Sequence, residues 1–558
     1  MKGIWKALIS FFVLMMVFTG AIAETADSAS AEQSGEKKVL VIETTDVHGY
    51  IMDASSGKED TFQYRLAYMA YLFDAARTSG EYDDVLLLDG GDLYQGPPIS
   101  NLTGGATIRA AFDVMKYDAV ALGNHEFDWD VTEYAADQDG TIAPYVLGDY
   151  FGDPKTPVLA SNLYDAKTGE RVPFTRDYTV VERAGLKIAI VGYIEDYSDT
   201  IMHEKIVPYS IDPDTDKLNA LVRKIRDEEH PDAVIVLAHA DPEPLAEAVD
   251  PTLVNLVAGG HTHQIAADFA GNGVPYIQGN HYGYGFASAV LRIAANDEIK
   301  VDEVQYTSIT DDKALLYDTE ENEAHLNSDI MDVSRVTWAV VKKEMSEVLG
   351  YTDTPVMNMG EGVATGAGNW ITGMMLQGMQ SEGVLAAFYN TWGIRASLEI
   401  PEGQTTREVT VNDIFTLTPF GDKLLMFDIT GKELATHLEK ALHHSDYGDQ
   451  MSGLRFTYTA TGNPESPREK RDYTVKSITF DDGTEVDIND TEKLYRVCIT
   501  DFCASIPGSV FEGKEPVNQP ADAPIETDVF FSLLREAREK DGGRISVDTS
   551  EKGIEVTE

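Results

Sequence analysis

The sequence predicts an α/β protein, and three observations support this prediction. Short apolar runs rich in Val, Leu and Ile are typical of strands buried on both faces. Segments with helical spacing of apolar residues separate these runs. Five runs also end in Asp, His or Asn, and ligands in open α/β sheets bind beyond the carboxyl ends of the strands. These runs are Val39-Leu-Val-Ile-Glu-Thr-Thr-Asp46-Val-His48, Val85-Leu-Leu-Leu-Asp-Gly-Gly-Asp92, Ala119-Val-Ala-Leu-Gly-Asn-His-Glu-Phe-Asp128, Val234-Ile-Val-Leu-Ala-His239 and Val254-Asn-Leu-Val-Ala-Gly-Gly-His261-Thr-His263.

The N-terminus has the pattern of a secretory signal peptide, expected over residues 1–23. Lys2 and Lys6 precede an apolar run from Ala7 to Phe18, and small residues follow it. The run is shorter than the roughly 20 residues of a membrane span, although an uncleaved leader acting as an anchor is an alternative. Residues 24–36 are expected to form a flexible spacer. We therefore expect a mature chain without a transmembrane anchor, secreted to the periplasm or the cell exterior.

The charge balance limits the partners. The chain of 558 residues has 94 acidic and 44 basic residues, a formal net charge of -50. Binding of a nucleic-acid polymer requires a basic surface, so we expect none. An enzyme with this charge that acts on small anions needs a local cationic centre, because its overall field repels anions. The two cysteines, Cys498 and Cys503, could pair or remain as buried free thiols.

The first domain is expected over residues 37–300, where strands and helices alternate. Helical apolar spacing predicts helices at 63–77, 105–117 and 216–229. Additional strands are expected at 178–183, 186–194 and 286–293. A linker is predicted at 301–349, including a connecting helix over 333–349.

A second domain is expected over residues 350–545, followed by an acidic tail at 546–558. Its predicted helices span 369–379 and 431–442, and its predicted strands span 424–429, 473–480 and 494–500. The oligomeric state does not follow from the sequence.

The residue types at the strand ends suit hard divalent cations, which bind mixtures of carboxylate, imidazole and amide ligands. Asp46 and His48 are two residues apart at a strand end, so both can face one ion. Asn124 is a neutral ligand, and the next residue, His125, is then free to act on the reacting phosphate. Asp128 can orient His125 and favour its protonated form. The other histidines are expected to have packing or surface roles; they are His203, His230, His281, His325, His437, His443 and His444.

These motifs resemble the two-domain bacterial 5'-nucleotidase and UDP-sugar hydrolase family of the calcineurin-like metallophosphoesterases. The resemblance implies a two-sheet β-sandwich flanked by helices, followed by an α+β C-terminal domain. It also implies two divalent metal ions, whose identity (Zn, Mn, Co, Mg or Ca) is open. One ion would be held by Asp46, His48 and His263, the other by Asn124, His239 and His261, with Asp92 bridging them. His125 and Asp128 would form the catalytic dyad.

The second domain also resembles that family, with departures. The motifs Asn390-Thr-Trp-Gly-Ile-Arg395 and Thr418-Pro-Phe420-Gly-Asp imply that Asn390, Arg395, Phe420 and Phe502 bind substrate. An arginine usual in the family is missing from Met359 to Asn369. An acidic residue usual after the second aromatic is missing near Gly508, and Trp392 replaces a small residue. The hydrolytic half therefore matches the family better than the nucleotide-binding half.

The leading prediction is a secreted phosphoesterase that uses metal-activated water to hydrolyse nucleotides, above all nucleoside 5'-monophosphates. The alternatives from the same superfamily are a 2',3'-cyclic-nucleotide phosphodiesterase with 3'-nucleotidase activity and a UDP-sugar hydrolase. An alternative of another class is a surface ligand-binding protein with a vestigial metal site.

Overall fold

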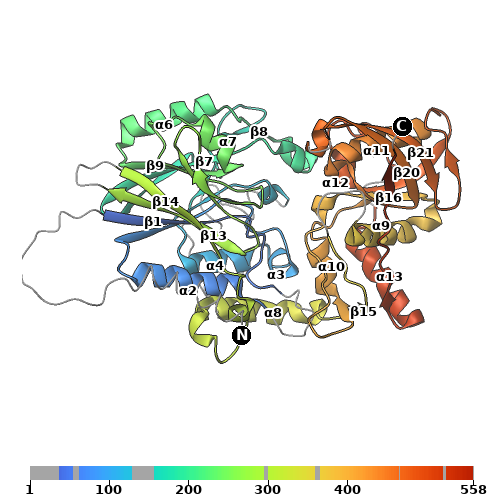
Figure 1. Ribbon diagram of the computed structural model, residues 1–558, viewed down its shortest axis with the longest axis horizontal. Coiled ribbons are helices and arrows are strands. Elements are labelled where there is room, and N and C mark those ends of the chain that lie inside the picture. Colours follow the sequence, from blue (N-terminus) through green and yellow to red (C-terminus); the bar gives the residue numbers. More distant parts are fainter. Residues whose placement is uncertain are drawn as a thin grey trace, which may run out of the picture.

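Two domains lie side by side, the first at the left of Figure 1 and the second at the right. The computed structural model describes residues 37–53, 62–128, 156–293, 299–358, 365–463, 466–518 and 523–556. The expected signal peptide (1–23) and spacer (24–36) lie outside the described residues. None of the helices in the described ranges is long and apolar enough to cross a membrane.

The first domain contains two six-stranded sheets, so the predicted sandwich is confirmed. In the first sheet, β1, β2, β3 and β4 are parallel, and the antiparallel β13 and β14 complete the other side. β14 extends this sheet to Ser308, beyond the expected limit at residue 300. The strands are β1 (Lys37–Thr44), β2 (Asp84–Asp89), β3 (Ala119–Ala121), β4 (Val158–Leu159), β13 (Gly285–Ile293) and β14 (Ile299–Ser308).

The second sheet has the order β11-β12-β10-β9-β7-β6. Its four inner strands are parallel, and β6 and β11 pair antiparallel at the two edges. The strands are β6 (Tyr178–Arg183), β7 (Leu186–Ile194), β9 (Ala233–His239), β10 (Leu256–Ala258), β11 (Ile265–Phe269) and β12 (Pro275–Gly279).

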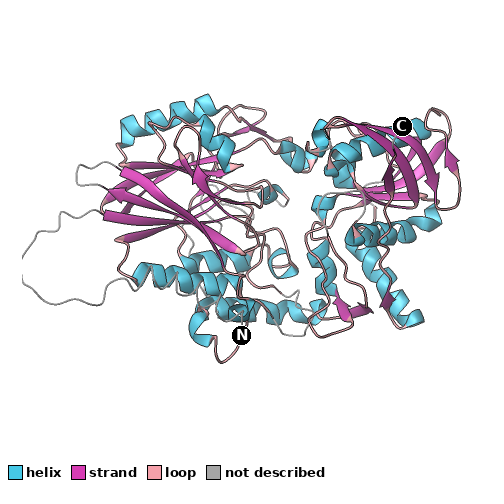
Figure 2. Ribbon diagram, in the orientation of Figure 1, coloured by secondary structure: helices cyan, strands magenta, loops and turns pink. Residues whose placement is uncertain are grey.

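Alternation of side chains along the strands explains why these runs are apolar throughout. Val39 and Val41 pack between the two sheets, whereas Leu40 and Ile42 pack beneath the outer helices. Figure 2 shows the helices on both outer faces of the sandwich. Three predicted helices correspond to α2, α4 and α6. The α-helices of this domain in the described residues are α2 (Arg65–Thr78), α3 (Pro98–Asn101), α4 (Ala106–Met115), α5 (His203–Ile206), α6 (Thr215–Glu229) and α7 (Pro242–Ala248).

Helix α8 (Ser328–Met345) connects the domains and contributes to both cores. Met331 belongs to the first-domain core, and Met345 belongs to the second-domain core. The predicted end of this helix at residue 349 is wrong. Leu349 lies in β15 (Val348–Thr352), because this segment pairs with β17 (Arg407–Thr410) in the second domain.

The second domain combines three small sheets with helices on their faces. Residues 546–558, expected as a tail, include β25, which pairs with β20 and extends a four-stranded sheet. The remaining elements are α9 (Gly366–Met379), β16 (Ala386–Tyr389), α10 (Val411–Leu417), β18 (Leu424–Thr430), α11 (Gly431–His443), β19 (Gln450–Ser452), β20 (Leu454–Thr461), β21 (Asp472–Phe480), β22 (Glu485–Val486), β23 (Leu494–Thr500), α12 (Asp501–Ser505), α13 (Glu526–Asp541), β24 (Arg544–Ile545) and β25 (Gly553–Glu555).

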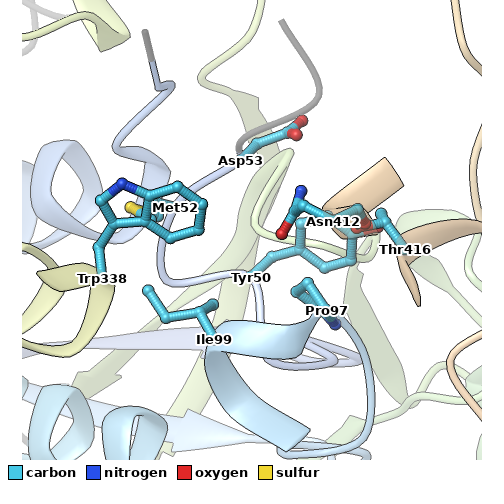
Figure 3. A pocket seen from close by; sticks show the side chains of 8 residues that line it. All are labelled: Tyr50, Met52, Asp53, Pro97, Ile99, Trp338, Asn412 and Thr416. Atoms are coloured by element: carbon cyan, nitrogen blue, oxygen red, sulfur yellow. Dashed lines mark hydrogen bonds between the residues drawn. The ribbon is translucent and has the colours of Figure 1, made fainter. Parts of the chain in front are cut away.

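The two domains meet at a small cavity, which Figure 3 shows. Tyr50 and Ile99 of the first domain, Trp338 of α8, and Asn412 and Thr416 of α10 surround this cavity. Its volume is about 10 Å³, which is the room of a single water molecule.

Candidate metal centre and active-site cleft

The predicted metal ligands lie together where the two sheets end. They follow parallel strands: β1 and β2 in the first sheet, β9 and β10 in the second, with Asn124 after β3. Their ligand-type atoms form overlapping groups within 4.8 Å of one another. One group contains Asp46, His48 and His263, and another contains Asp92, His239 and His261.

Asp92 lies between the two groups. Its Oδ2 is 3.6 Å from His48 Nε2 and 3.3 Å from His239 Nε2. Asn124 completes the second group, because its Oδ1 lies 2.9 Å from both His239 Nε2 and His261 Nδ1. The structure thus brings all seven predicted ligands to one place.

Cationic groups already stabilise this collection of acceptors, which shows that it suits cations. Burial opposes charge on His239, but the Asp92 carboxylate raises the pKa of His239 to about 10, so a proton sits among the ligands. In the other group, Arg395 Nη2 donates to His48 Nε2 at 2.8 Å. Asp46 Oδ1 forms no hydrogen bond within the described part of the chain. Divalent ions would replace the proton and the guanidinium and satisfy these atoms.

Backbone carbonyls orient two of the ligand rings. His48 Nδ1 is 2.9 Å from Gln95 O, and His239 Nδ1 is 2.8 Å from Gly90 O. A ring that donates through Nδ1 presents the lone pair of Nε2 to the ligand position.

The loops carrying the ligands are strained. Five of the seven predicted ligands have left-handed backbone conformations, which cost about 1–3 kcal/mol each outside glycine. The φ angles are 51° at Asp46, 47° at His48, 56° at Asp92, 71° at His261 and 56° at His263. Because the surrounding fold imposes these conformations, the ligand positions are set before any ion binds.

Glycine allows these loops to approach each other closely. A Cβ atom at Gly123 would lie 2.1 Å from Asp92 Oδ1 and 2.5 Å from its backbone nitrogen. The Glu126 carboxylate then joins the two loops, since it accepts hydrogen bonds from Gly123 N at 2.8 Å, Asp92 N at 3.1 Å and Leu93 N at 2.7 Å. Glu126 therefore positions Asp92 and Asn124 relative to each other.

His125 and Asp128 form a hydrogen-bonded pair at the edge of this centre. His125 Nδ1 and Asp128 Oδ2 are 2.7 Å apart, and His125 N donates to Asp92 Oδ1 at 2.9 Å. Although burial alone would lower it, the carboxylates of Asp128 and Asp92 raise the pKa of His125. The pairing leaves His125 Nε2 free to donate a proton toward the cleft.

One cavity of about 470 Å³ joins this centre to the second domain. The four predicted substrate-binding residues, Asn390, Arg395, Phe420 and Phe502, line it together with His125 and Asp92. The ring centroid of Phe420 is 5.5 Å from that of His125 and 5.7 Å from the Arg395 guanidinium carbon. One cleft thus contains both Arg395, whose guanidinium suits a phosphate group, and the aromatic side chains.

Several site residues escaped sequence reasoning. Tyr197 stacks on the ring of His261 with centroids 3.5 Å apart, and His281 stacks on that of His263 at 4.4 Å. His444 and Trp392 also line the cleft, and half of the surface of Trp392 is exposed. The short distance of His281 from the Gly-His-Thr-His motif was a usable signal, whereas nothing near Tyr197 in the sequence marks it.

Cys498 and Cys503 are buried free thiols in different core clusters.

Comparison with known proteins agrees with this geometry. The family model for calcineurin-like phosphoesterases matches residues 39–265, and that for the 5'-nucleotidase C-terminal domain matches residues 348–511. Protein UshA of Escherichia coli is 24% identical, with 78% of this chain and 80% of UshA covered. The trifunctional nucleotide phosphoesterase YfkN of Bacillus subtilis is 25% identical over 86% of this chain, but the match spans only 33% of YfkN. A 5'-nucleotidase precursor from Thermus thermophilus superposes with a TM-score of 0.73 at 20% identity, covering 93% of this chain and 100% of that chain.

Fold and site together define a metal-dependent phosphoric ester hydrolase. The chain combines a region that matches the calcineurin-like phosphoesterase model with a region that matches the model of the 5'-nucleotidase C-terminal domain. The expectation of a ligand-binding protein with a vestigial metal site is not supported, since all seven predicted ligands remain and lie together.

Proposed function

We propose that this protein hydrolyses nucleotides, above all nucleoside 5'-monophosphates, to nucleoside and phosphate outside the cytoplasmic membrane. The cleft carries this proposal, because one cavity is lined by four of the predicted metal ligands and also by Arg395 and two phenylalanine rings. A phosphate at the metal end would leave its nucleoside among the aromatic residues. The names of YfkN and of a 5'-nucleotidase from Vibrio vulnificus that is 24% identical to this chain support nucleotides as the substrate class.

In this proposal, Asp46, His48 and His263 hold one divalent ion, Asn124, His239 and His261 hold a second, and Asp92 contacts both. Bound divalent ions supply Lewis acidity, which lowers the pKa of water and neutralises phosphoryl charge. His125 donates a hydrogen bond or a proton from Nε2, while Asp128 holds the ring in place. Arg395 suits a phosphate oxygen, since its guanidinium offers paired donors. Phe420 and Phe502 offer faces on which a base stacks.

Replacement of Asp92 by Ala tests the metal centre. We expect hydrolysis of every substrate to fall below about one thousandth of wild type, because one carboxylate contacts both ligand groups. Activity should be measured with Mn, Zn, Co, Mg and Ca, and bound metal by elemental analysis. Substantial activity with two ions still bound would contradict the two-metal proposal. The same assays with 2',3'-cyclic nucleotides and UDP-sugars decide between the alternative substrates.

Replacement of Phe420 by Ala tests the nucleotide half. Stacking of a base on an aromatic ring contributes about 1–3 kcal/mol, so kcat/KM for AMP should fall about five- to 150-fold. A small aryl phosphate lacks the base, and its kcat/KM should change much less. Equal losses for the two substrates would assign Phe420 to packing, and a wild-type enzyme without nucleotide activity would point to another phosphoester.

A further inference from the structure

The aromatic end of the cleft contains a carboxyl group without a partner. Asp422 is only 7% exposed and lines the cavity together with Phe420 and Phe502. Across the described ranges of the chain, its side chain forms no hydrogen bond and no ion pair. A carboxyl group that lines a cavity without a partner from the protein is available to a ligand that enters the cavity.

The neighbouring charges do not compensate Asp422, because they are acidic. Burial, followed by the carboxylates of Asp501 and Asp128, raises the pKa of Asp422 well above its ordinary value. The second acid in this part of the cleft, Asp446, differs, since its Oδ2 lies 3.4 Å from His444 Nδ1. Asp422 is therefore the acid whose hydrogen-bonding capacity is left for the ligand.

The position of Asp422 suits contact with the edge of a stacked ring. It follows Phe420 by two residues, and Asp501 directly precedes Phe502 at the start of helix α12. A ring held on these aromatic faces directs its edge, and not its face, toward the adjoining side chains. In either protonation state a carboxyl group keeps an oxygen that accepts an N–H. The amino groups of cytosine and adenine donate such N–H groups, whereas uracil and hypoxanthine present an oxo acceptor at the same place.

We propose that Asp422 makes the enzyme prefer bases with an amino group, cytosine and adenine, over their oxo counterparts, uracil and hypoxanthine. This inference rests on the proposed nucleotide hydrolysis and adds its base specificity. A site built to hydrogen-bond one group rejects the analogue that leaves a buried acceptor unpaired.

The test compares kcat/KM for CMP with UMP and for AMP with IMP, because each pair differs at the amino or oxo position. We expect wild type to favour the amino base by about tenfold or more. Asp422→Asn should reduce both ratios to within about threefold, because an amide can offer either NH₂ or oxygen. Asp482→Asn is the matched control, since Asp482 is an exposed turn residue of the same domain, and it should keep the wild-type ratios.

Ratios near one in wild type, or ratios that Asp422→Asn leaves unchanged, would overturn the inference while nucleotide hydrolysis itself stands. Hydrolysis of aryl phosphate without hydrolysis of any nucleotide would instead remove the proposed function, and the inference with it. Calorimetric binding of cytidine and uridine to the wild-type protein provides a second measurement that needs no variant. Cytidine should bind about tenfold more tightly, and equal affinities would count against the role of Asp422.

Discussion

At the scale of single residues, His125 illustrates how the centre separates metal binding from proton transfer. Its backbone N–H contacts Asp92 Oδ1 at 2.9 Å, but its side chain is paired with Asp128 at 2.7 Å. The ring lies beside the predicted ligands, and its ligand-type nitrogen is within 4.8 Å of the ligand atoms of His48 and Asp92. We propose that this ring acts on the substrate and is not a metal ligand.

Replacement of His125 by Ala should lower kcat about 10²- to 10⁴-fold, the usual contribution of general acid–base catalysis. Bound metal should stay near the wild-type amount, because the contact to Asp92 uses the backbone. Steady-state kinetics and elemental analysis of the same preparation check both statements. Parallel loss of activity and metal would place His125 among the ligands.

Some residues of the site could be predicted from the sequence, and others could not. The seven ligands follow strand ends, and the parallel strands bring those ends together, so position along the chain was informative. Tyr197 and Asp422 gave no such signal, because each reaches the cleft from a loop whose course depends on tertiary packing. The left-handed φ angles at Asp46 and His261 were also not evident from the sequence, since such angles are uncommon outside glycine, even though Asp and His adopt them more often than most residues.

At the scale of elements, a buried network supports the loop that carries Asn390 and Arg395. Asp449 Oδ1 accepts hydrogen bonds from Thr391 N at 2.9 Å and Thr391 Oγ1 at 2.7 Å. Arg468 Nη1 donates to Asp449 Oδ2 at 3.0 Å and balances its charge. These buried hydrogen bonds hold the loop that presents Asn390 and Arg395 to the cleft, and residues that recognise a ligand need such support.

Helix α11 contains a histidine that makes this domain sensitive to acid. His437 is 1% exposed, neither ring nitrogen has a hydrogen-bond partner in the described residues, and Phe388 and Phe511 adjoin it. Burial lowers the pKa of His437 to about 3. Below its ordinary pKa of about 6.5 the unfolded chain gains a proton that the folded chain does not, so stability falls as pH decreases.

Replacement of His437 by Leu should remove this acid sensitivity. Between pH 7 and pH 5 the wild type should lose about 2 kcal/mol more of its free energy of unfolding than the variant. Urea unfolding of both proteins at the two pH values measures the difference, and contributions shared by both cancel. Equal losses would mean that His437 is protonated in the folded state.

The predicted helices and strands were least accurate where pairing with a strand that is distant in the sequence overrides the local pattern of apolar residues. The apolar spacing through Leu349 continues that of α8, yet pairing with β17 makes this segment a strand. Residues 553–555 carry little pattern of their own and form β25 only because β20 offers an open edge. The long, periodic elements of the sandwich were predictable because burial on both faces fixes their composition.

At the scale of the whole molecule, the net charge of -50 opposes the approach of anionic substrates. We expect kcat/KM for AMP to rise about two- to tenfold as salt increases from about 10 to 300 mM, because the screening length shortens from about 30 Å to below 10 Å. Free metal should be held constant during the titration. The inhibition constant of uncharged adenosine serves as control and should stay nearly flat. A fall of kcat/KM with salt would show that local positive charge in the cleft outweighs the overall field.

The contact between Gly123 and Asp92 also governs which sequences this centre tolerates. With only 2.1 Å between a Cβ at position 123 and Asp92 Oδ1, even alanine would displace the carboxylate that faces both ligand groups. In a saturation library scored for activity, position 123 should tolerate no replacement, although glycine itself binds nothing. Substitutions elsewhere in the surrounding chain must therefore be compatible with glycine at position 123. We expect the backbone conformation of this loop to be retained even where the residues packed behind it change.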